Sequence, residues 1–412
     1  MAPIRSRAAV APVRRRPESA RTPLMLPGVS ELVAADRPTE PMHCLRPATI
    51  AAAARRFVGG FVGDVLYAVK CNPEPAVLRA LWAGGVRHFD CASAAEVRLV
   101  RQMFPKAQIH FMHPVKSRPA IREAYERHAV RDFVLDSAEE LEKILQETGG
   151  AADLGLVVRL AMPKGGAVYD LSGKFGAPLE EAVALLRAAR PHAVRLGLSF
   201  HVGSQCLDPA AYGRALALAG EAVRGAGVPV EVIDVGGGFP VAYPDVTPPP
   251  LGDYFAAIRE GFAALGLPTA RLWAEPGRAL VAAGTSVVVQ VEARRGDVLY
   301  VNDGVYGSLS DAGAPGFRFP ARMIRPERGT SDTLRPFAFF GPTCDSADFM
   351  RGPFLLPEDI REGDWIEIGQ LGAYGGCLRT AFNGFDRARM AEVRDQPLLE
   401  TPGHAEEIAA AA

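Results

Sequence analysis

Apolar and polar positions alternate between two kinds of segment from about residue 64 to residue 276. Short apolar runs, which are typical of buried strands, are separated by longer stretches in which apolar residues recur with a helical period. The expected strands lie near 64–69, 86–90, 108–112, 132–135, 155–161, 195–200, 230–234 and 271–274. The expected helices lie near 48–59, 75–83, 93–103, 117–127, 137–147, 177–189, 208–226 and 251–265. This alternation predicts right-handed crossovers and a parallel sheet.

Eight such units within roughly 230 residues match the size of an α/β protein of the (β/α)₈ TIM-like barrel type. A doubly wound open sheet is the alternative. A polar residue or glycine follows nearly every apolar run, and in a barrel the carboxyl ends of the strands converge on one face that carries the chemistry. These residues are Lys70, Asp90, His113, Asp136, Arg159, His201, Gly236 to Gly238 and Glu275.

After about residue 280 the runs become short, β-rich and separated by Gly, Pro and Asp, which predicts a second, antiparallel β-domain. We expect a disordered basic tail at 1–23, one or more strands from 24–44 contributed to the β-domain, the barrel at 45–279, the β-domain at 280–400 and a flexible tail at 401–412. Within 24–44, the apolar triplet Leu32–Ala34 is the candidate strand. A transit peptide shares the composition of the basic tail, but its prolines argue against an amphipathic helix.

The composition excludes several classes of partner. The formal net charge of −1 gives no sign of nucleic-acid or membrane binding, and no apolar run approaches the roughly 20 residues that span a bilayer. The six cysteines lack Cys-x-x-Cys spacing, which argues against a zinc site or a disulfide framework and favours a reducing, cytoplasmic compartment. They are Cys44, Cys71, Cys91, Cys206, Cys344 and Cys377.

Lys70 ends the first expected strand, and Asn72–Pro73 follows as a turn signal. A lysine at the end of a buried strand is costly unless it is paired or neutralised. Desolvation would lower its pKa and make it a competent amine nucleophile of the Schiff-base type. A lysine that merely extends its amine to solvent is the alternative.

Three consecutive glycines, Gly236 to Gly238, follow the seventh expected strand. They allow backbone amides to approach an anion closely, and barrels often bind phosphate after strands seven and eight. Glu275 and Arg278 end the eighth strand, where an ordinary ion pair is the alternative. A lysine, a phosphate cradle and an acid for a protonated ring nitrogen together predict a pyridoxal phosphate site.

Further candidates have both functional and structural interpretations. His201 could stack on a cofactor ring, with Ser204 near its phosphate, or be an ordinary buried histidine. Cys344 could return a proton to a carbanion while Asp345 binds a cationic group, or the two could form a buried thiol and a solvated turn. Tyr374, between glycines, could donate to phosphate or pack at a rim.

Over about residues 40–390 the chain resembles the fold type III pyridoxal-phosphate decarboxylases, which are the ornithine and diaminopimelate decarboxylase group. The ornithine decarboxylase branch is the most similar. The resemblance rests on blocks in a fixed order: Tyr67–Asn72, Phe89–Ser93, Ser199–Ser204, Asp234–Pro240, Ala274–Arg278, Val301–Gly307, Gly341–Asp345 and Gly372–Tyr374.

The resemblance implies that Lys70 carries the cofactor as a Schiff base, supported by Asp90 and Arg159. It implies that His201 stacks on the ring and Glu275 pairs with its nitrogen. Cys344 would protonate the product carbanion, and Asp345 would meet the substrate's distal amine across a homodimer interface. Residues around the phosphate would be Ser204, Gly236, Gly237, Gly238, Gly277, Arg278 and Tyr374.

The Cys344-Asp345 pair favours a diamino acid, with ornithine first and lysine or a related basic amino acid as the alternative. Eukaryotic ornithine decarboxylases carry a second substrate aspartate nine residues after the tyrosine that corresponds to Tyr306, and here that position is Pro315. Asp311 could stand in for it, so that Tyr306 and Asp311 join Asp345 as candidate substrate residues, or the distal pocket could be remodelled around Phe317 and Arg318. A non-catalytic regulatory homologue and an amino acid racemase are the alternatives of other classes.

Overall fold

The computed structural model describes residues 26–163, 167–169 and 173–403. The basic tail predicted at 1–23 lies outside these residues, as does most of the tail predicted at 401–412. In the part of the chain so described, no helix combines the length and the hydrophobicity needed to cross a lipid bilayer.

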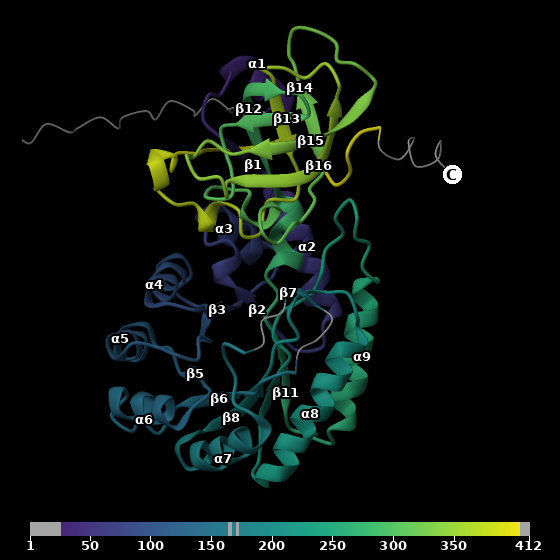
Figure 1. Cartoon of the computed structure of the whole chain (residues 1–412). Helices are drawn as coiled ribbons and strands as arrows, with labels where there is room; N and C mark the ends of the chain where they lie inside the picture. Colours follow the sequence, from purple (N-terminus) through teal and green to yellow (C-terminus); the bar gives the residue numbers. More distant parts are fainter. Residues whose placement is uncertain (1–25, 164–166, 170–172, 404–412) are drawn as a thin grey trace, which may run out of the picture.

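Eight parallel strands close into a barrel (Figure 1), so the barrel prediction is confirmed and the open sheet is wrong. Each strand falls within two or three residues of its predicted position. The strands are β2 (Asp64–Ala68), β3 (His88–Cys91), β4 (Gln108–Phe111), β5 (Asp132–Leu135), β6 (Gly155–Arg159), β8 (Arg195–Ser199), β10 (Val232–Asp234) and β11 (Arg271–Ala274).

Helices follow the strands around the outside of the barrel (Figure 1). Three of them begin where a serine side chain caps the first turn: Ser93, Ser117 and Ser137 accept hydrogen bonds from backbone amides three residues on. The helices are α2 (Pro47–Gly60), α3 (Pro75–Ala83), α4 (Ala94–Met103), α5 (Arg118–His128), α6 (Ala138–Glu147), α7 (Leu179–Ala189), α8 (Ala210–Ala226) and α9 (Leu251–Ala264).

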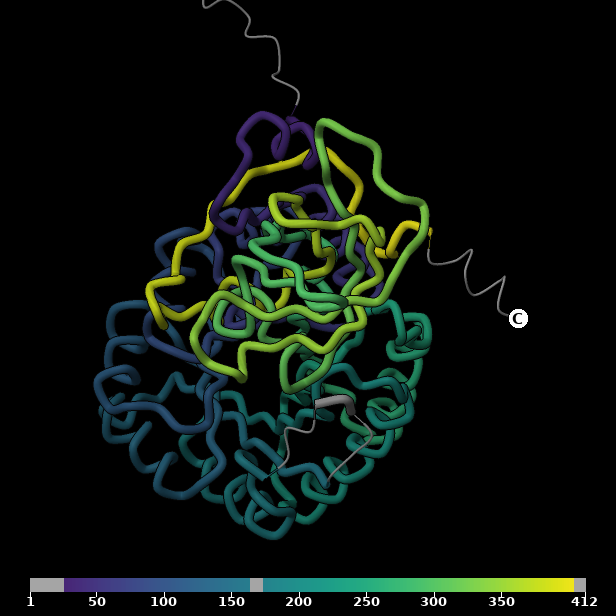
Figure 2. Tube along the Cα trace, turned by 45° about the horizontal axis from the view of Figure 1, so that its top comes forward, coloured from purple at the N-terminus to yellow at the C-terminus, as the bar shows by residue number. Residues whose placement is uncertain are grey.

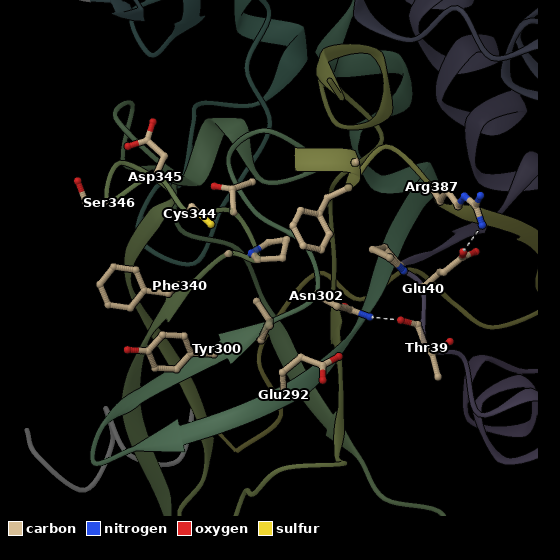
Figure 3. Close-up of a pocket in the computed structure, with 17 residues that line it drawn as sticks. Thr39, Glu40, Glu292, Tyr300, Asn302, Phe340, Cys344, Asp345, Ser346 and Arg387 are labelled. Atoms are coloured by element: carbon tan, nitrogen blue, oxygen red, sulfur yellow. Dashed lines mark hydrogen bonds and ion pairs between the residues drawn. The ribbon is translucent and has the colours of Figure 1, made fainter. Parts of the chain in front are cut away.

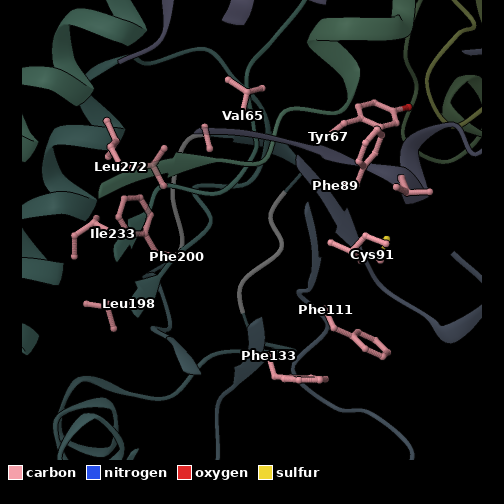
Figure 4. Packing of buried hydrophobic residues seen from close by; sticks show 14 of the residues in the cluster. Val65, Tyr67, Phe89, Cys91, Phe111, Phe133, Leu198, Phe200, Ile233 and Leu272 are labelled. Atoms are coloured by element: carbon pink, nitrogen blue, oxygen red, sulfur yellow. The ribbon is translucent and has the colours of Figure 1, made fainter. Parts of the chain in front are cut away.

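Alternate residues of the barrel strands face opposite ways, and each set packs separately. One set packs against the helices, and Figure 4 shows its members, including Tyr67, Phe89 and Phe200. The other set fills the barrel interior with Leu66, Met112, Val134, Val157, Val232 and Trp273. Most strands are apolar on both faces, whereas β3 and β4 turn the polar side chains of His88, Asp90 and His110 away from their apolar neighbours in the outer set.

The second domain is an eight-stranded sheet that covers the mouth side of the barrel (Figure 1). It is mainly antiparallel, with parallel pairing only between β13 and β15 and between β1 and β18 among the described strands. The strands are β1 (Met42–Leu45), β12 (Thr285–Arg295), β13 (Val298–Val301), β14 (Ala321–Ile324), β15 (Leu334–Phe340), β16 (Phe349–Pro357), β17 (Trp365–Ile368) and β18 (Arg389–Glu392).

The strand expected at Leu32–Ala34 is wrong, because these residues lie in helix α1 (Val29–Asp36). Val29 and Val33 are four residues apart and both buried, so they share one helical face, and the Glu31 side chain accepts from the Gly28 amide at the helix start. The N-terminal segment enters the sheet later, as β1, beside the C-terminal β18. Figure 2 shows these purple and yellow segments running together.

A buried ion pair joins the two domains. Arg46, directly before α2, places its guanidinium 2.9 Å from Glu367 of β17, and both side chains are almost fully buried. Arg46 also donates to Ser286, and Glu367 also accepts from Arg322. Removing one partner of a buried pair leaves an uncompensated charge, so this contact fixes the sheet on the barrel.

We predict that Arg46→Met lowers the free energy of unfolding by about 3 kcal/mol, at the lower end of the range for such pairs because Glu367 keeps Arg322. Urea denaturation of the purified protein measures this. Arg37→Met, which removes an exposed pair with Glu327, should change the free energy of unfolding little. Similar losses for the two variants would contradict the prediction.

Candidate active site

Lys70 and Asp90 form an ion pair at the mouth of the barrel. Lys70 lies in a 3₁₀ turn (Val69–Cys71) directly after β2, and Ala68 of β2 pairs in register with Asp90 of β3. The Lys70 Nζ is 2.6 Å from the Asp90 Oδ2. Asp90 is buried, whereas the Lys70 side chain keeps 45% of its surface accessible. The lysine therefore points into an open site while its partner is fixed in the wall.

The expectation that Lys70 has a lowered pKa is wrong. Burial by itself would lower the pKa of the ammonium, but the Asp90 carboxylate and then Glu275 act in the opposite direction and raise it above its usual value. In the protein without a cofactor Lys70 is therefore a paired ammonium, and it needs to lose a proton before it can attack a carbonyl.

The triple-glycine turn, His201 and Glu275 meet on the side of the mouth where β11 pairs with β2, the strand that precedes Lys70. The strands β8, β10 and β11 are neighbours, so the loops after them lie side by side. A Cβ added to Gly237 would be 3.1 Å from the His201 Nε2 and 2.7 Å from the Glu275 carbonyl oxygen. Gly236 and Gly238 have φ values of 68° and 102°, which favour glycine. Side chains in this turn would fill the space between these groups.

His201 is a neutral imidazole in this arrangement. Burial, followed by the nearby positive charges of Arg159 and Lys70, lowers its pKa to about 3. Its Nδ1 accepts a hydrogen bond of 3.0 Å from the Gly203 amide. The ring is thereby fixed in one tautomer, with the proton on Nε2, and an uncharged flat ring suits stacking on an aromatic cofactor.

The carboxyls of Asp234, which is buried, and Glu275, which is half-buried, interact with each other. Burial first, and then the charge of Asp234, raises the pKa of Glu275 well above its usual range, and burial raises the pKa of Asp234 to about 6. The Asp234 Oδ1 accepts from the Gly236 amide at 2.9 Å, which joins this pair to the glycine turn. The raised pKa favours the protonated form of Glu275, and a cationic ring nitrogen beside it would favour the ionised form.

Arg278 and Tyr374 close the site from the domain junction. Arg278 begins the short helix α10 (Arg278–Val281), and its guanidinium lies 5.1 Å from the Tyr374 ring centroid. The Tyr374 amide donates to the Cys71 carbonyl at 2.9 Å, which holds its loop against the turn that carries Lys70. A Cβ at Gly277 would lie 2.9 Å from the Cys71 Cβ, so only glycine allows this approach without a shift.

Two further predicted cofactor residues lie at strand ends on the same face. Arg159 is the last residue of β6 and interacts electrostatically with Glu275 and His201. Ser204 begins the short strand β9 (Ser204–Cys206), three residues after His201. Strand β9 pairs with β7 (Ala167–Tyr169). Both residues are therefore carried by elements that surround the glycine turn.

Cys344, Asp345 and Tyr306 lie together on the β-domain. The Tyr306 hydroxyl donates a short hydrogen bond to the Asp345 carboxylate, which also accepts from the Ala347 amide. Cys344 and Asp345 line an open cavity of about 730 Å³ whose walls come from segments 39–41, 292–302, 340–346 and 384–387. In Figure 3 Cys344 and Asp345 lie on the side of this cavity opposite Thr39 and Glu40.

Asp311, expected as a substrate residue, lies beside Arg278. Its carboxylate lies 2.9 Å from the Arg278 guanidinium, and both side chains are buried. It belongs to a 3₁₀ turn (Ser310–Ala312) of the β-domain.

Sequence reasoning missed two residues that the structure adds to the site. Asp234 was visible as an acid at the end of a buried strand, directly before the glycine turn, and this position is a signal that could have identified it. Tyr243, whose hydroxyl accepts from Arg278 at 2.9 Å, lies in an irregular segment with no pattern that marks it.

The site residues fit pyridoxal phosphate. A lysine, a neutral imidazole, an acid and a glycine turn with space left by three missing side chains converge on one side of the mouth. The set offers a partner for the aldehyde, the ring, the ring nitrogen and the phosphate.

Residues 48–282 match the pyridoxal binding domain of the pyridoxal-dependent decarboxylases. The chain is 34% identical over 342 residues to the lysine/ornithine decarboxylase of Selenomonas ruminantium, covering 81% of this chain and 84% of that protein. It is also 34% identical over 363 residues to the ornithine decarboxylase of Panagrellus redivivus, covering 81% and 80% of the two chains.

Among solved structures, the lysine/ornithine decarboxylase of Vibrio vulnificus complexed with putrescine superposes with a TM-score of 0.76 at 32% identity. The superposition covers 90% of this chain and 99% of that one. The predictions of a pyridoxal phosphate cofactor and of decarboxylase chemistry are thereby confirmed. This chain belongs to the pyridoxal-dependent ornithine and lysine decarboxylase family.

Proposed function

We propose that this protein decarboxylates a basic L-amino acid, with L-ornithine as the first candidate, giving putrescine, and lysine as the alternative. The observation that carries the proposal is the convergence of the Lys70–Asp90 pair with His201, Glu275 and the glycine turn. The names of the relatives, which include ornithine and lysine/ornithine decarboxylases, support the choice of substrate.

Bound pyridoxal phosphate supplies an electron sink for the bond that loses carbon dioxide. In this proposal Lys70 binds the aldehyde, while Asp90 accepts a hydrogen bond from its ammonium and orients it. His201 stacks on the ring, and Glu275 binds the ring nitrogen. Arg159 balances the acids of the site. The phosphate is surrounded by Ser204, Gly236, Gly237, Gly238, Gly277, Arg278 and Tyr374.

The remaining two roles belong to the β-domain. Cys344 delivers the proton that replaces the carboxylate, and Asp345, held by Tyr306, binds the distal ammonium of the substrate. Both residues line an open cavity rather than the wall of their own barrel, and exposed aromatic side chains, Phe382 and Phe385, lie on the neighbouring loop. We therefore propose a homodimer in which Cys344 and Asp345 of each subunit complete the site of the other.

A cytoplasmic location is part of the proposal. All six cysteines are free thiols, and two of them, Cys344 and Cys377, are exposed. A reducing compartment would keep such thiols available for proton transfer.

The first prediction tests cofactor and substrate together. Purified protein should show the visible absorption band of bound pyridoxal phosphate and release carbon dioxide from ornithine, with lysine, arginine and diaminopimelate assayed alongside. Lys70→Ala should lose both the band and the activity, because Lys70 is the amine that pairs with Asp90 among the residues that the structure describes. A band that persists in Lys70→Ala, or release only from diaminopimelate, would reject the proposal.

The second prediction concerns the pKa of Lys70. Asp90→Asn removes the carboxylate 2.6 Å from the ammonium, so the pKa of Lys70 should fall by on the order of 1–3 units. Reductive alkylation of the cofactor-free protein, followed by mass spectrometry of the Lys70 peptide, gives the midpoint pH of its reaction with an aldehyde. Asp136→Asn, at the end of a different barrel strand, is the matched control and should leave this midpoint unchanged. An unchanged midpoint in Asp90→Asn would refute the assigned pairing.

The third prediction tests the shared site. Lys70→Ala and Cys344→Ala should each be nearly inactive, but an equal mixture that is unfolded and refolded together should regain about a quarter of wild-type activity. Half of the dimers would be hybrids, and each hybrid would carry one site with both residues intact. A mixture that stays inactive, while size-exclusion chromatography shows dimers, would mean that the site is built from one subunit.

A further inference from the structure

Arg278 has several partners within the chain, from both domains. Its guanidinium donates to the Tyr243 hydroxyl at 2.9 Å and lies 2.9 Å from the Asp311 carboxylate. It also lies over two aromatic rings, with its carbon 4.9 Å from the Phe317 centroid and 5.1 Å from the Tyr374 centroid. The Arg278 side chain is only 5% exposed, and that of Asp311 only 10%.

These partners come from three separate parts of the chain. Tyr243 follows the glycine turn of the barrel, whereas Asp311, Phe317 and Tyr374 belong to the second domain. Burial alone would lower the pKa of Arg278, but Tyr243 and Asp311 raise it above its usual value. Arg278 is therefore a fixed cation, and its charge is balanced across the domain junction.

A buried cation of this kind needs an anion beside it, because an uncompensated charge in the interior costs several kcal/mol. The proposed function gives Arg278 a second anion, the phosphate of the cofactor. One guanidinium then serves two anions, and only one of them is present when the site holds no phosphate.

We propose that Asp311 acts as the resident counter-ion of Arg278 and balances the charge of this buried side chain while the site holds no phosphate. The proposal rests on the proposed function, which assigns Arg278 to the phosphate. It gives Asp311 a role toward the cofactor in place of the substrate role expected from sequence. The distal ammonium of the substrate is then left to Asp345.

If Asp311 is the counter-ion of Arg278, its removal should change stability differently in the empty and the phosphate-bound protein. Without the Asp311 carboxylate, Arg278 lacks its nearest anion in the cofactor-free protein, whereas bound phosphate restores one. Asp311→Asn should therefore destabilise the empty protein more than the phosphate-bound protein. By linkage, the variant should bind phosphate more tightly than the wild type does. A residue that only packs at the junction would instead affect both states equally.

The experiment measures melting temperatures of the full-length protein without cofactor, with inorganic phosphate and with pyridoxal phosphate. We expect Asp311→Asn to melt lower than the wild type without cofactor and to recover most of the difference when phosphate is added. Isothermal titration should give a dissociation constant for inorganic phosphate that is lower by about tenfold or more.

Three variants serve as controls. Asp132→Asn removes a buried carboxylate that pairs with Arg195 at the opposite end of the barrel, so its loss of stability should be the same with and without phosphate. Tyr243→Phe removes a hydrogen bond to Arg278 but no formal charge, so its loss of stability should also be the same with and without phosphate. Asp311→Glu keeps the carboxylate and should resemble the wild type in its response to phosphate.

The outcomes separate the alternatives. Equal destabilisation of Asp311→Asn with and without phosphate, no destabilisation, or weaker phosphate binding would each overturn the proposal. If Asp311→Asn is insoluble without cofactor, refolding in phosphate should recover soluble protein, and failure to recover it would overturn the proposal as well. Failure of the proposed function is seen separately, as a wild-type protein without a Lys70-dependent cofactor band or carbon dioxide release.

Discussion

The ion pair between Lys70 and Asp90 is the contact on which the proposed chemistry of this protein depends. The register of two adjacent parallel strands brings Asp90 level with Ala68, and the turn after β2 carries the lysine over it. The Asp90 carboxylate is buried in the barrel wall, whereas the Lys70 ammonium reaches into the opening. The carboxylate therefore fixes the position of the amine. Because the pair is part of the barrel itself, the amine is oriented before any cofactor arrives.

The charges at the barrel mouth are balanced in two separate groups. Asp90 and Glu275 both act on Lys70, and burial, followed by the charge of neighbouring acids, raises the pKa values of Asp234 and Glu275. This end of the site would accept a cation such as a protonated ring nitrogen. The other end holds Arg278, which would accept an anion. A cofactor with a basic ring nitrogen and a phosphate matches this polarity along its length.

The β-domain contributes in two distinct ways. Its inner loops hold Arg278 through Asp311 and place Tyr374 against the turn of Lys70, so they complete the cofactor side of the site. Its outer loops hold Cys344 and Asp345 on an open cavity, away from the residues of their own barrel that surround the glycine turn. Both sets of loops need a sheet that is fixed relative to the barrel, and the buried Arg46–Glu367 ion pair fixes it.

Local patterns in the sequence determined the barrel, its eight strands and the placement of Lys70, His201 and Glu275 at strand ends, because strand and helix periods reflect burial of nearby residues. The same reasoning failed at Leu32–Ala34, where a short apolar triplet fits a strand or one face of a helix equally well. Only the tertiary structure decided the direction of the Lys70 pKa shift and the position of Asp311 beside Arg278. Both depend on charges from distant segments, and the sequence carries no local record of which charges meet across a domain junction.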